Sequence, residues 1–205
     1  MIGMNIIFDK RKKYILEDDY VQLRPLEVSD FEILKAFGVD EPELWKYTLQ
    51  DAGSEEGMKQ YIETALTRQE KGTAYTFIVF DKKNKEYAGS TRLYDIDLVS
   101  NNLSLGYTWY GKKFQGTGLN KHCKYLLFEF IFEQLEFERI EFRLDSENER
   151  SMRAIKSLGC TFEGILRSNG YKIDGTRRDS AVLSIVRKEW LESKKELLKN
   201  KITHG

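Results

Sequence analysis

The chain of 205 residues contains 33 basic and 33 acidic residues, and 40% of its residues are hydrophobic. This length fits one domain with a sizeable core, and a formal charge of zero gives no overall basic field of the kind that binds nucleic acid. No segment is apolar enough to span a bilayer, and residues 1–10 lack the apolar stretch and cleavage site of a signal peptide, so we expect a cytoplasmic protein with no membrane partner.

The first third of the chain predicts one strand followed by two helices, over residues 16–26, 29–37 and 54–71. Ser29 and Ser54 are the expected N-caps of the helices. Residues 38–57 look irregular and contain six acidic residues against the single basic Lys46. They could form an acidic mouth that attracts a cationic amine, or a solvated loop.

Three successive strands are expected next, over residues 73–80, 87–94 and 103–110. The third alternates apolar and polar positions. In a regular strand this alternation places four side chains on one face, those of Leu103, Leu105, Tyr107 and Trp109.

A long helix is predicted from Gly118 to Gln134, because apolar residues recur there at helical spacing. Its expected core face consists of Cys123, Leu126, Leu127, Phe130, Ile131 and Gln134, and is widened by Phe128 and Phe132. A strand over 139–144, a helix over 148–158 ended by Gly159, and strands over 161–167 and 178–186 follow. This order indicates an α/β fold, more fully an α+β plan with a mixed sheet.

We expect a single domain over residues 1–205, with its core at about 16–190 and a charged helical tail at 188–205. The two cysteines, Cys123 and Cys160, lack the spacing of metal ligands and are interpreted as reduced, buried thiols. With only His122 and His204 besides, no metal site is expected.

The segment from Phe114 to Asn120, Phe-Gln-Gly-Thr-Gly-Leu-Asn, joins the expected strand to the long helix. Exposed amides at a helix N-terminus favour an anion such as pyrophosphate, although glycines at such a turn can also be purely steric. The chain has no Walker Gly-Lys-Ser/Thr sequence, and Lys121 replaces the third glycine of a dinucleotide fingerprint. The remaining functional interpretation is an anion-binding loop of another protein family.

Several ordered motifs resemble the GNAT superfamily of acetyl-CoA-dependent N-acetyltransferases, most closely the branch that contains the ribosomal-protein acetyltransferases RimJ and RimL. The resemblance covers about residues 16 to 190. Its motifs are Leu23–Leu26, Leu103–Tyr110, Gln115–Asn120, Asn148–Ile155, Leu158–Cys160, Glu163–Arg167 and Asp174-Gly175-x-x-Arg178-Asp179.

The resemblance implies a GNAT-like fold, in which a mostly antiparallel sheet contains one splayed pair of parallel strands and is flanked by helices. It implies that acetyl-CoA binds as co-substrate in the splay, without a metal. The residues it implies for cofactor binding are Tyr107, Thr108, Trp109, Tyr110, Lys113, Gln115, Gly116, Thr117, Gly118, Leu119, Asn120, Asn148 and Ser151. For Tyr107 and Trp109 the implied contact is made by the backbone.

Two of these residues, Asn148 and Ser151, are also implied in catalysis near the cofactor sulfur. Asn148 equally fits a helix N-cap. The family's cofactor loop usually has Gln or Arg where this chain has Lys113, which keeps a charge but lacks the fork geometry of arginine. Relatives tend to carry a glutamate in the stretch that is Ser168–Tyr171 here, so the general base is unassigned. We expect structural roles for Glu163, Arg178 and Asp179.

The expected function is therefore acetyl transfer from acetyl-CoA to a primary amine by direct attack in a ternary complex. The acceptor is either a protein N-terminus, as in the ribosomal-protein enzymes, or a small molecule. A catalytically weak acyl-CoA-binding module with a regulatory or interaction role is the alternative, and an unrelated nucleotide-binding fold is a third interpretation. Many members of the family dimerise, which leaves a homodimer open.

Overall fold

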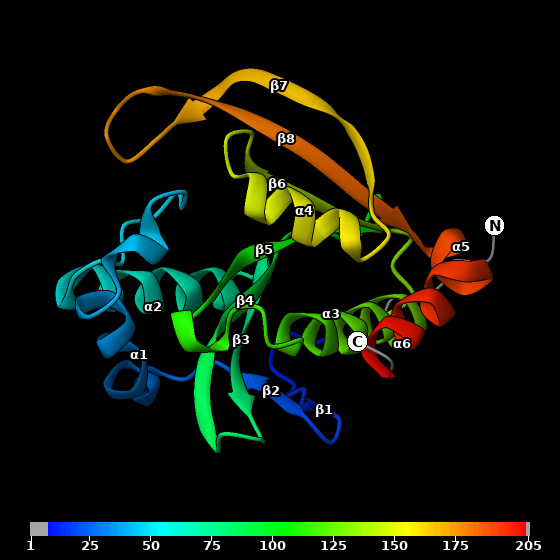
Figure 1. Cartoon of the computed structure of the whole chain (residues 1–205), viewed down its shortest axis with the longest axis horizontal. Helices are drawn as coiled ribbons and strands as arrows, with labels where there is room; N and C mark the ends of the chain where they lie inside the picture. Colours follow the sequence, from blue (N-terminus) through cyan, green and yellow to red (C-terminus); the bar gives the residue numbers. More distant parts are fainter. Residues whose placement is uncertain (1–7, 204–205) are drawn as a thin grey trace.

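One eight-stranded sheet runs through the computed structural model, which describes residues 8–203 (Figure 1). The strand order is β1-β2-β3-β4-β5-β6-β8-β7, and all neighbours are antiparallel except the parallel pair β5 and β6. The strands are β1 (Leu16–Glu17), β2 (Val21–Pro25), β3 (Ala74–Asp81), β4 (Glu86–Asp97), β5 (Asn102–Tyr110), β6 (Arg139–Asp145), β7 (Thr161–Tyr171) and β8 (Arg177–Val186). Residues 1–7, which belong to the segment inspected for a signal peptide, lie outside the described residues, and so does His204.

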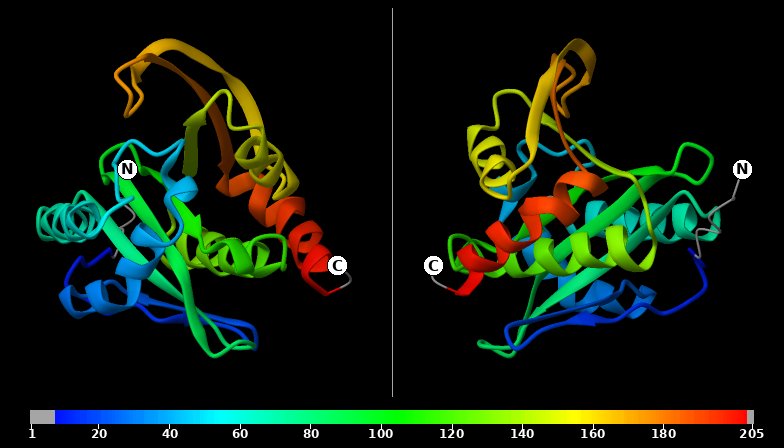
Figure 2. Two further views of the ribbon diagram at one scale, coloured as in Figure 1. Left: turned by 60° about the vertical axis from the view of Figure 1, so that its left-hand side comes forward. Right: turned by 90° about the vertical axis from the view of Figure 1, so that its right-hand side faces the viewer.

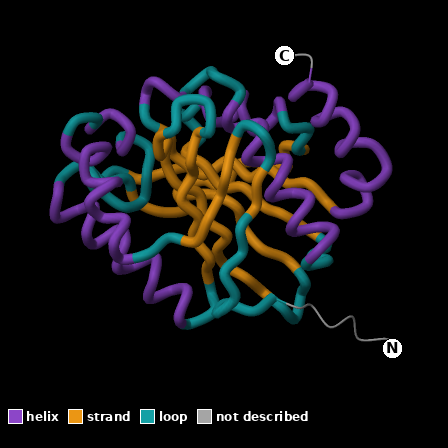
Figure 3. Tube along the Cα trace, turned by 90° about the horizontal axis from the view of Figure 1, so that it is seen from below, coloured by secondary structure: helices purple, strands orange, loops and turns teal. Residues whose placement is uncertain are grey.

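Helices cover both faces of this sheet (Figure 3). They are α1 (Phe31–Val39), α2 (Glu55–Glu70), α3 (Leu119–Glu129), α4 (Glu149–Ser157), α5 (Arg187–Glu189) and α6 (Lys195–Thr203). Helices α1 and α2 pack on one face, whereas α3, α4 and α6 contribute to the larger core on the other face. None of the helices within residues 8–203 is both long and apolar enough to cross a membrane.

The expected mixed sheet with one parallel strand pair and flanking helices is confirmed. The prediction of one strand over residues 16–26 was wrong, because β1 and β2 form a hairpin. The Asp18 carboxylate accepts hydrogen bonds from the amides of Tyr20 and Val21 (both 2.8 Å), which fixes the turn between the two strands.

The start of α1 also differs from the prediction. Ser29 does not cap it; a 3₁₀ turn over Val28–Asp30 precedes the helix, and Asp30 accepts a hydrogen bond from the Glu27 amide (2.8 Å). The Arg24 guanidinium also donates to the buried Asp30 carboxylate, at 2.6 Å. Two other caps are as expected: Ser54 accepts from the Gly57 amide, and Gly159 ends α4 at φ 94°.

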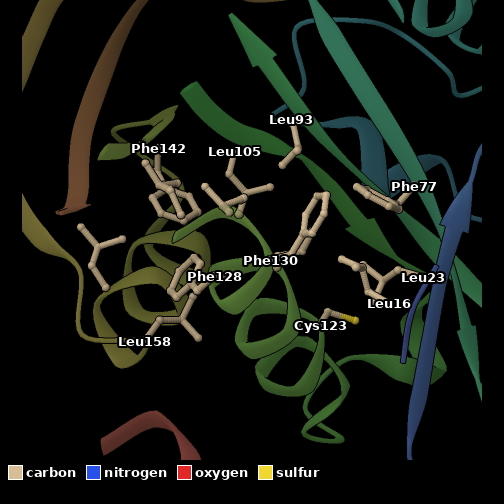
Figure 4. Close-up of a cluster of buried hydrophobic side chains, with 14 of the residues drawn as sticks. Leu16, Leu23, Phe77, Leu93, Leu105, Cys123, Phe128, Phe130, Phe142 and Leu158 are labelled. Carbon is tan, nitrogen blue, oxygen red and sulfur yellow. The ribbon is translucent and has the colours of Figure 1, made fainter. Parts of the chain in front are cut away.

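The long helix changes its winding after Glu129, where a π-helical turn spans Phe130–Gln134. A π turn takes up an extra residue, so the side-chain directions shift relative to a regular helix. Phe132 is buried as expected, whereas the expected core position Gln134 is exposed. The remaining expected core positions pack with side chains from the sheet and α4, including those of Leu105, Phe142 and Leu158 (Figure 4).

The C-terminal tail is part of the core. Trp190 is fully buried against Phe128, Phe132 and Tyr125, and its ring nitrogen donates to Glu133 (2.8 Å). In α6, Leu198 is 1% exposed whereas its neighbour Leu197 is 54% exposed. The core therefore extends beyond residue 190, and α6 lies beside α3 (Figure 2).

These two adjacent leucines provide a matched test of the tail. Leu198→Ala should lower the free energy of unfolding by about 2–5 kcal/mol, because it removes buried methyl groups and leaves a cavity. Leu197→Ala should change it by no more than about 0.5 kcal/mol. Urea denaturation followed by tryptophan fluorescence measures both, and equal effects would contradict the packing of α6.

Candidate active site

A cleft opens in the middle of the sheet, where the two parallel strands separate. β5 pairs with β6 only from Asn102 to Ser104, whereas β6 stays paired with β8 along its whole length. The cleft between them has a volume of about 1590 Å³, and residues from β5, β6, α3 and α4 line it. Figure 1 shows β6 and α4 lying apart from the far end of β5.

A β-bulge lies at the point of divergence. Arg92 pairs with Gly106 and Ser90 with Trp109, so β5 has one residue more than β4 over this stretch, and Tyr107 takes a positive φ of 47°. The bulge reverses the alternation of side chains. The prediction that Leu103, Leu105, Tyr107 and Trp109 share one face was therefore wrong.

The bulge places the side chains of β5 before and after it on opposite faces of the sheet. Leu103 and Leu105 belong to the core beneath α3, whereas Tyr107 and Trp109 turn toward α1 and α2. On the side facing β6, the backbone beyond Ser104 is no longer part of a ladder. It presents peptide groups that an extended ligand can use as an additional strand would.

The loop between β5 and α3 contributes three backbone amides to the cleft. Gly116 and Gly118 take positive φ values of 75° and 89°, and a side chain added at either would meet no protein atom within 4 Å. Within residues 8–203, the amides of Gly116, Thr117 and Gly118 donate no hydrogen bond. Gly118 is also the N-cap of α3, so these donors lie at the positive end of its dipole.

Side chains hold this loop against its neighbours. Gln115 donates to the Tyr110 carbonyl (2.8 Å) and accepts from Arg150 of α4 (2.5 Å), while Thr117 donates to the Phe114 carbonyl (2.8 Å). Lys113, at the position of the family's Gln or Arg, is bound to Glu86. Lys121 and Arg150 add positive charge to the lining. The arrangement suits a phosphate group.

Asn148 and Ser151 lie together at the start of α4 and line the same cleft. The Asn148 side-chain oxygen accepts from the Ser151 amide (3.0 Å), which is the N-cap bond expected for that residue. The Ser151 hydroxyl makes no hydrogen bond to the described residues, so it can donate into the cleft. The other residues expected at the cofactor site all line this cleft as well: Tyr107–Tyr110, Lys113 and Gln115–Asn120.

The segment of residues 38–57 lines the cleft mainly with side chains that are not acidic, those of Leu44 and Lys46 to Leu49. Of its six carboxylates, only that of Glu43 lines it. Glu41 accepts from the Lys112 amide (2.6 Å) and Asp51 from the Gly53 amide (2.8 Å), so both have local structural roles. The hairpin of β7 and β8 projects beyond the other strands of the sheet (Figure 2).

Glu163 is held away from the cleft in an ion pair. Arg139 donates two hydrogen bonds of 2.6 Å to it, and Ser184 donates a third of 2.7 Å. These bonds stabilise the charged form and lower the pKa of Glu163 to about 2. A structural role fits this placement. Arg178, by contrast, lines the cleft.

Two buried cations flank the bulge, and sequence reasoning missed both. Lys124 of α3 is 3% exposed and donates to the hydroxyls of Thr91 (3.0 Å) and Thr108 (2.9 Å). On the opposite face, Arg92 is fully buried between the rings of Tyr61 and Tyr107, at 4.8 and 4.3 Å from their centres. Nothing in the local pattern marks either residue, because a charged side chain is expected to reach solvent.

Both cysteines are buried free thiols, and burial raises the pKa of each to about 12. Across residues 8–203, no three His, Cys, Asp or Glu side chains come together as metal ligands would.

Comparison with known proteins agrees with this geometry. The sequence pattern of the acetyltransferase (GNAT) domain family matches residues 21–161. A Bacillus subtilis (strain 168) protein named "Probable N-acetyltransferase YjcK" is 28% identical over 178 residues, which are 84% of this chain and 97% of that protein.

Solved structures share the fold. A GCN5-related N-acetyltransferase from Brucella melitensis superposes with a TM-score of 0.85 at 24% identity, covering 95% of this chain and 87% of that one. RimL, a ribosomal L7/L12 alpha-N-protein acetyltransferase solved in complex with coenzyme A, gives 0.75 at 18% identity, covering 84% and 98%.

The burial of Lys124 generates a prediction about stability. Desolvation lowers the pKa of Lys124 to about 8, below the usual value of about 10.4 expected in the unfolded chain. Between these values the unfolded state binds more protons, so the stability of the protein rises with pH there. Lys124→Met lacks this titrating group. The free energy of unfolding of Lys124→Met minus that of the parent chain should therefore fall by about 3 kcal/mol between pH 8 and pH 10.4.

Urea denaturation at several pH values measures this difference. Lys199→Met, which removes an exposed helical lysine, controls for the loss of a positive charge. A difference between Lys124→Met and the parent chain that is independent of pH would contradict the burial of the charged lysine.

Proposed function

The chain belongs to the GNAT family of acetyltransferases, and on that premise we propose that it transfers the acetyl group of acetyl-CoA directly to a primary amine bound in the same cleft. The single observation that carries the proposal is that all the residues expected at the site, from β5, the glycine loop and α4, line one cleft. We also propose that the whole chain works as one acetyltransferase domain.

In this proposal the cofactor lies along the open edge of β5. The amides of Gly116, Thr117 and Gly118 would bind the pyrophosphate, because they are unpaired donors at a helix N-terminus. The peptide groups of β5 beyond the bulge would bind the pantetheine arm as an added strand, as supported by the absence of a ladder partner there.

The reaction forms a C–N bond and breaks the C–S bond of the thioester. The neutral amine attacks the carbonyl carbon, and a backbone N–H near Tyr107 would stabilise the oxygen as it gains negative charge. The sulfur leaves as a thiolate, whose conjugate thiol has a pKa of about 8.5. The proton lost from the amine neutralises this thiolate. The Ser151 hydroxyl would donate a hydrogen bond to that thiolate and so assist its departure.

The acceptor must be neutral when it attacks. A lysine-type amine of pKa about 10.4 pays roughly 4.6 kcal/mol for this at pH 7, an α-amino group of pKa about 8 only roughly 1.4 kcal/mol. Two buried carboxylates line the cleft, and both already have partners. Asp81 accepts from the amides of Lys83 (2.8 Å) and Asn84 (3.0 Å), and Asp145 accepts from the Glu147 amide (3.0 Å) and lies 4.0 Å from Arg178 and 3.9 Å from Lys172. A site without a dedicated base favours an α-amino group or another amine of low pKa.

Turnover tests the proposal directly. Purified protein is incubated with acetyl-CoA and a panel of N-terminal peptides and small amines, and CoA release is followed with a thiol reagent. We expect release above the hydrolysis background with at least one amine, together with an acetylated product by mass spectrometry. Binding of CoA without turnover across the panel would instead indicate an acyl-CoA-binding module, and absence of CoA binding would refute the proposal.

The glycine loop gives a sharper prediction. Gly118→Ala should weaken CoA binding by about tenfold, because the added methyl group enters the space in front of the amides. Gly175→Ala is the matched control: Gly175 has a similar φ of 81°, also meets no atom within 4 Å, and lies in the turn between β7 and β8, away from the cleft lining. Each substitution forces alanine into the left-handed region at a cost of about 1–2 kcal/mol.

Isothermal titration with CoA measures both variants, and thermal denaturation checks that they are folded. If both lose affinity equally, or neither does, the assignment of the glycine loop to the pyrophosphate is refuted.

A further inference from the structure

Arg178, at the start of β8, is a buried cation without a hydrogen-bonded anion. Its side chain is 5% exposed, and it lines the cleft. Its Nε is buried and makes no hydrogen bond to the described residues. The nearest carboxylate oxygen, Oδ2 of Asp145, lies 4.0 Å from Nε, beyond hydrogen-bond range.

The charged groups around Arg178 do not neutralise it. Asp145 is shared with Lys172, whose ammonium lies 3.9 Å away and itself donates to Glu147 (2.6 Å). Arg143, on β6, is bound to Glu141 (2.6 Å). Three carboxylates thus face three cations, but Lys172 and Arg143 each donate to a carboxylate, whereas Arg178 donates to none among the described residues.

A second arginine near the bulge, Arg92, forms no ion pair with the described residues and adds positive charge there. Arg92 has three buried guanidinium nitrogens with no hydrogen-bond partner among the described residues, and it stacks under the ring of Tyr107. The Tyr107 ring lines the cleft. Arg92 itself is fully buried, so it contributes its field, whereas Arg178 can make direct contact.

A buried guanidinium without an anion is costly. Removing a charge from water costs several kcal/mol unless hydrogen bonds to an opposite charge compensate it. Burial is also the main cause of the lowered pKa of Arg178. A carboxylate or phosphate in the cleft would accept charge-assisted hydrogen bonds from the planar guanidinium, which matches the geometry of both groups.

We propose that the acceptor is a small amine that also carries an anionic group, a carboxylate or a phosphate, and that Arg178 binds this group. The inference rests on the proposed acetyl transfer and names the class of acceptor. It differs from the alternative of an acidic mouth that attracts a cationic amine, because Glu43 is the sole carboxylate of residues 38–57 in the cleft lining.

Matched pairs of amines test the proposal. Alanine is compared with alaninamide, O-phosphoethanolamine with ethanolamine, and a diamine serves as the polycationic comparator; kcat/KM is expressed per concentration of neutral amine, because the members of a pair differ in amine pKa. With the wild-type enzyme we expect kcat/KM for the anionic member of at least one pair to exceed that of its neutral partner by about tenfold or more, the effect of one charge-assisted hydrogen bond. The pair that shows the preference tells a carboxylate from a phosphate.

Substitution of the arginine assigns the preference to a residue. Arg178→Met should abolish the preference by lowering kcat/KM for the anionic member at least about tenfold more than for the neutral member, and Arg178→Lys should retain part of it, since lysine keeps the charge without the fork. Arg177→Met is the control, because the exposed Arg177 stacks on Tyr171 outside the cleft lining. An equal loss with both members of a pair would indicate a structural role and overturn the proposal.

Binding separates this inference from the proposed function. The same amines are titrated into protein saturated with CoA. Tight binding of an anionic amine that Arg178→Met abolishes supports the subsite even if no amine is acetylated, in which case only the proposed function fails. Turnover that prefers neutral amines or the diamine, or binding without any preference for the anionic member, overturns the inference and leaves acetyl transfer intact.

Discussion

The site depends on the incomplete pairing of β5 with β6. The strands share a ladder only from Asn102 to Ser104, and beyond it β6 follows β8 instead. Peptide groups left without a strand partner inside a sheet must find water or a ligand, because burying them unpaired is costly. The bulge at Tyr107 bends β5 at the same place and reverses the alternation of side chains, so that Tyr107 and Trp109 lie on the face opposite to Leu103 and Leu105. One irregularity therefore opens the cleft and also orients its lining.

The two faces of the sheet have different chemistry at this point. On the face of α3 and α4 lie the amides of the glycine loop and the Ser151 hydroxyl, which suit a phosphate and a sulfur leaving group. On the face of α1 and α2 lie aromatic rings and buried arginines. Lys124 and Arg92 bring positive charge to both faces of the bulge, where the proposed reaction develops negative charge on oxygen. Buried cations add little to stability, so their position close to the bulge is better explained by chemistry.

Much of the fold could be predicted from the chain because local signals determine it. Alternating strands, the Ser54 cap, the Gly159 terminus and the Gly116–Gly118 loop all act over a few residues. The errors arose where structure depends on irregular backbone: the bulge reversed the faces after Leu105, and the π turn moved Gln134 outward. Motifs also led to the residues that line the cleft. Lys124, Arg92 and the cleft position of Arg178 could not be predicted, since distant strands and helices bury them.

The central claim is that the separation of β5 from β6 is the cofactor site, and a crystal structure with bound CoA tests it most directly. The account predicts that the pyrophosphate accepts hydrogen bonds from the amides of Gly116, Thr117 and Gly118. It predicts that the pantetheine arm runs along β5 beyond Ser104, with the sulfur beside Tyr107 and Ser151. CoA bound elsewhere on the molecule, or bound here with its pyrophosphate away from the glycine loop, would contradict it.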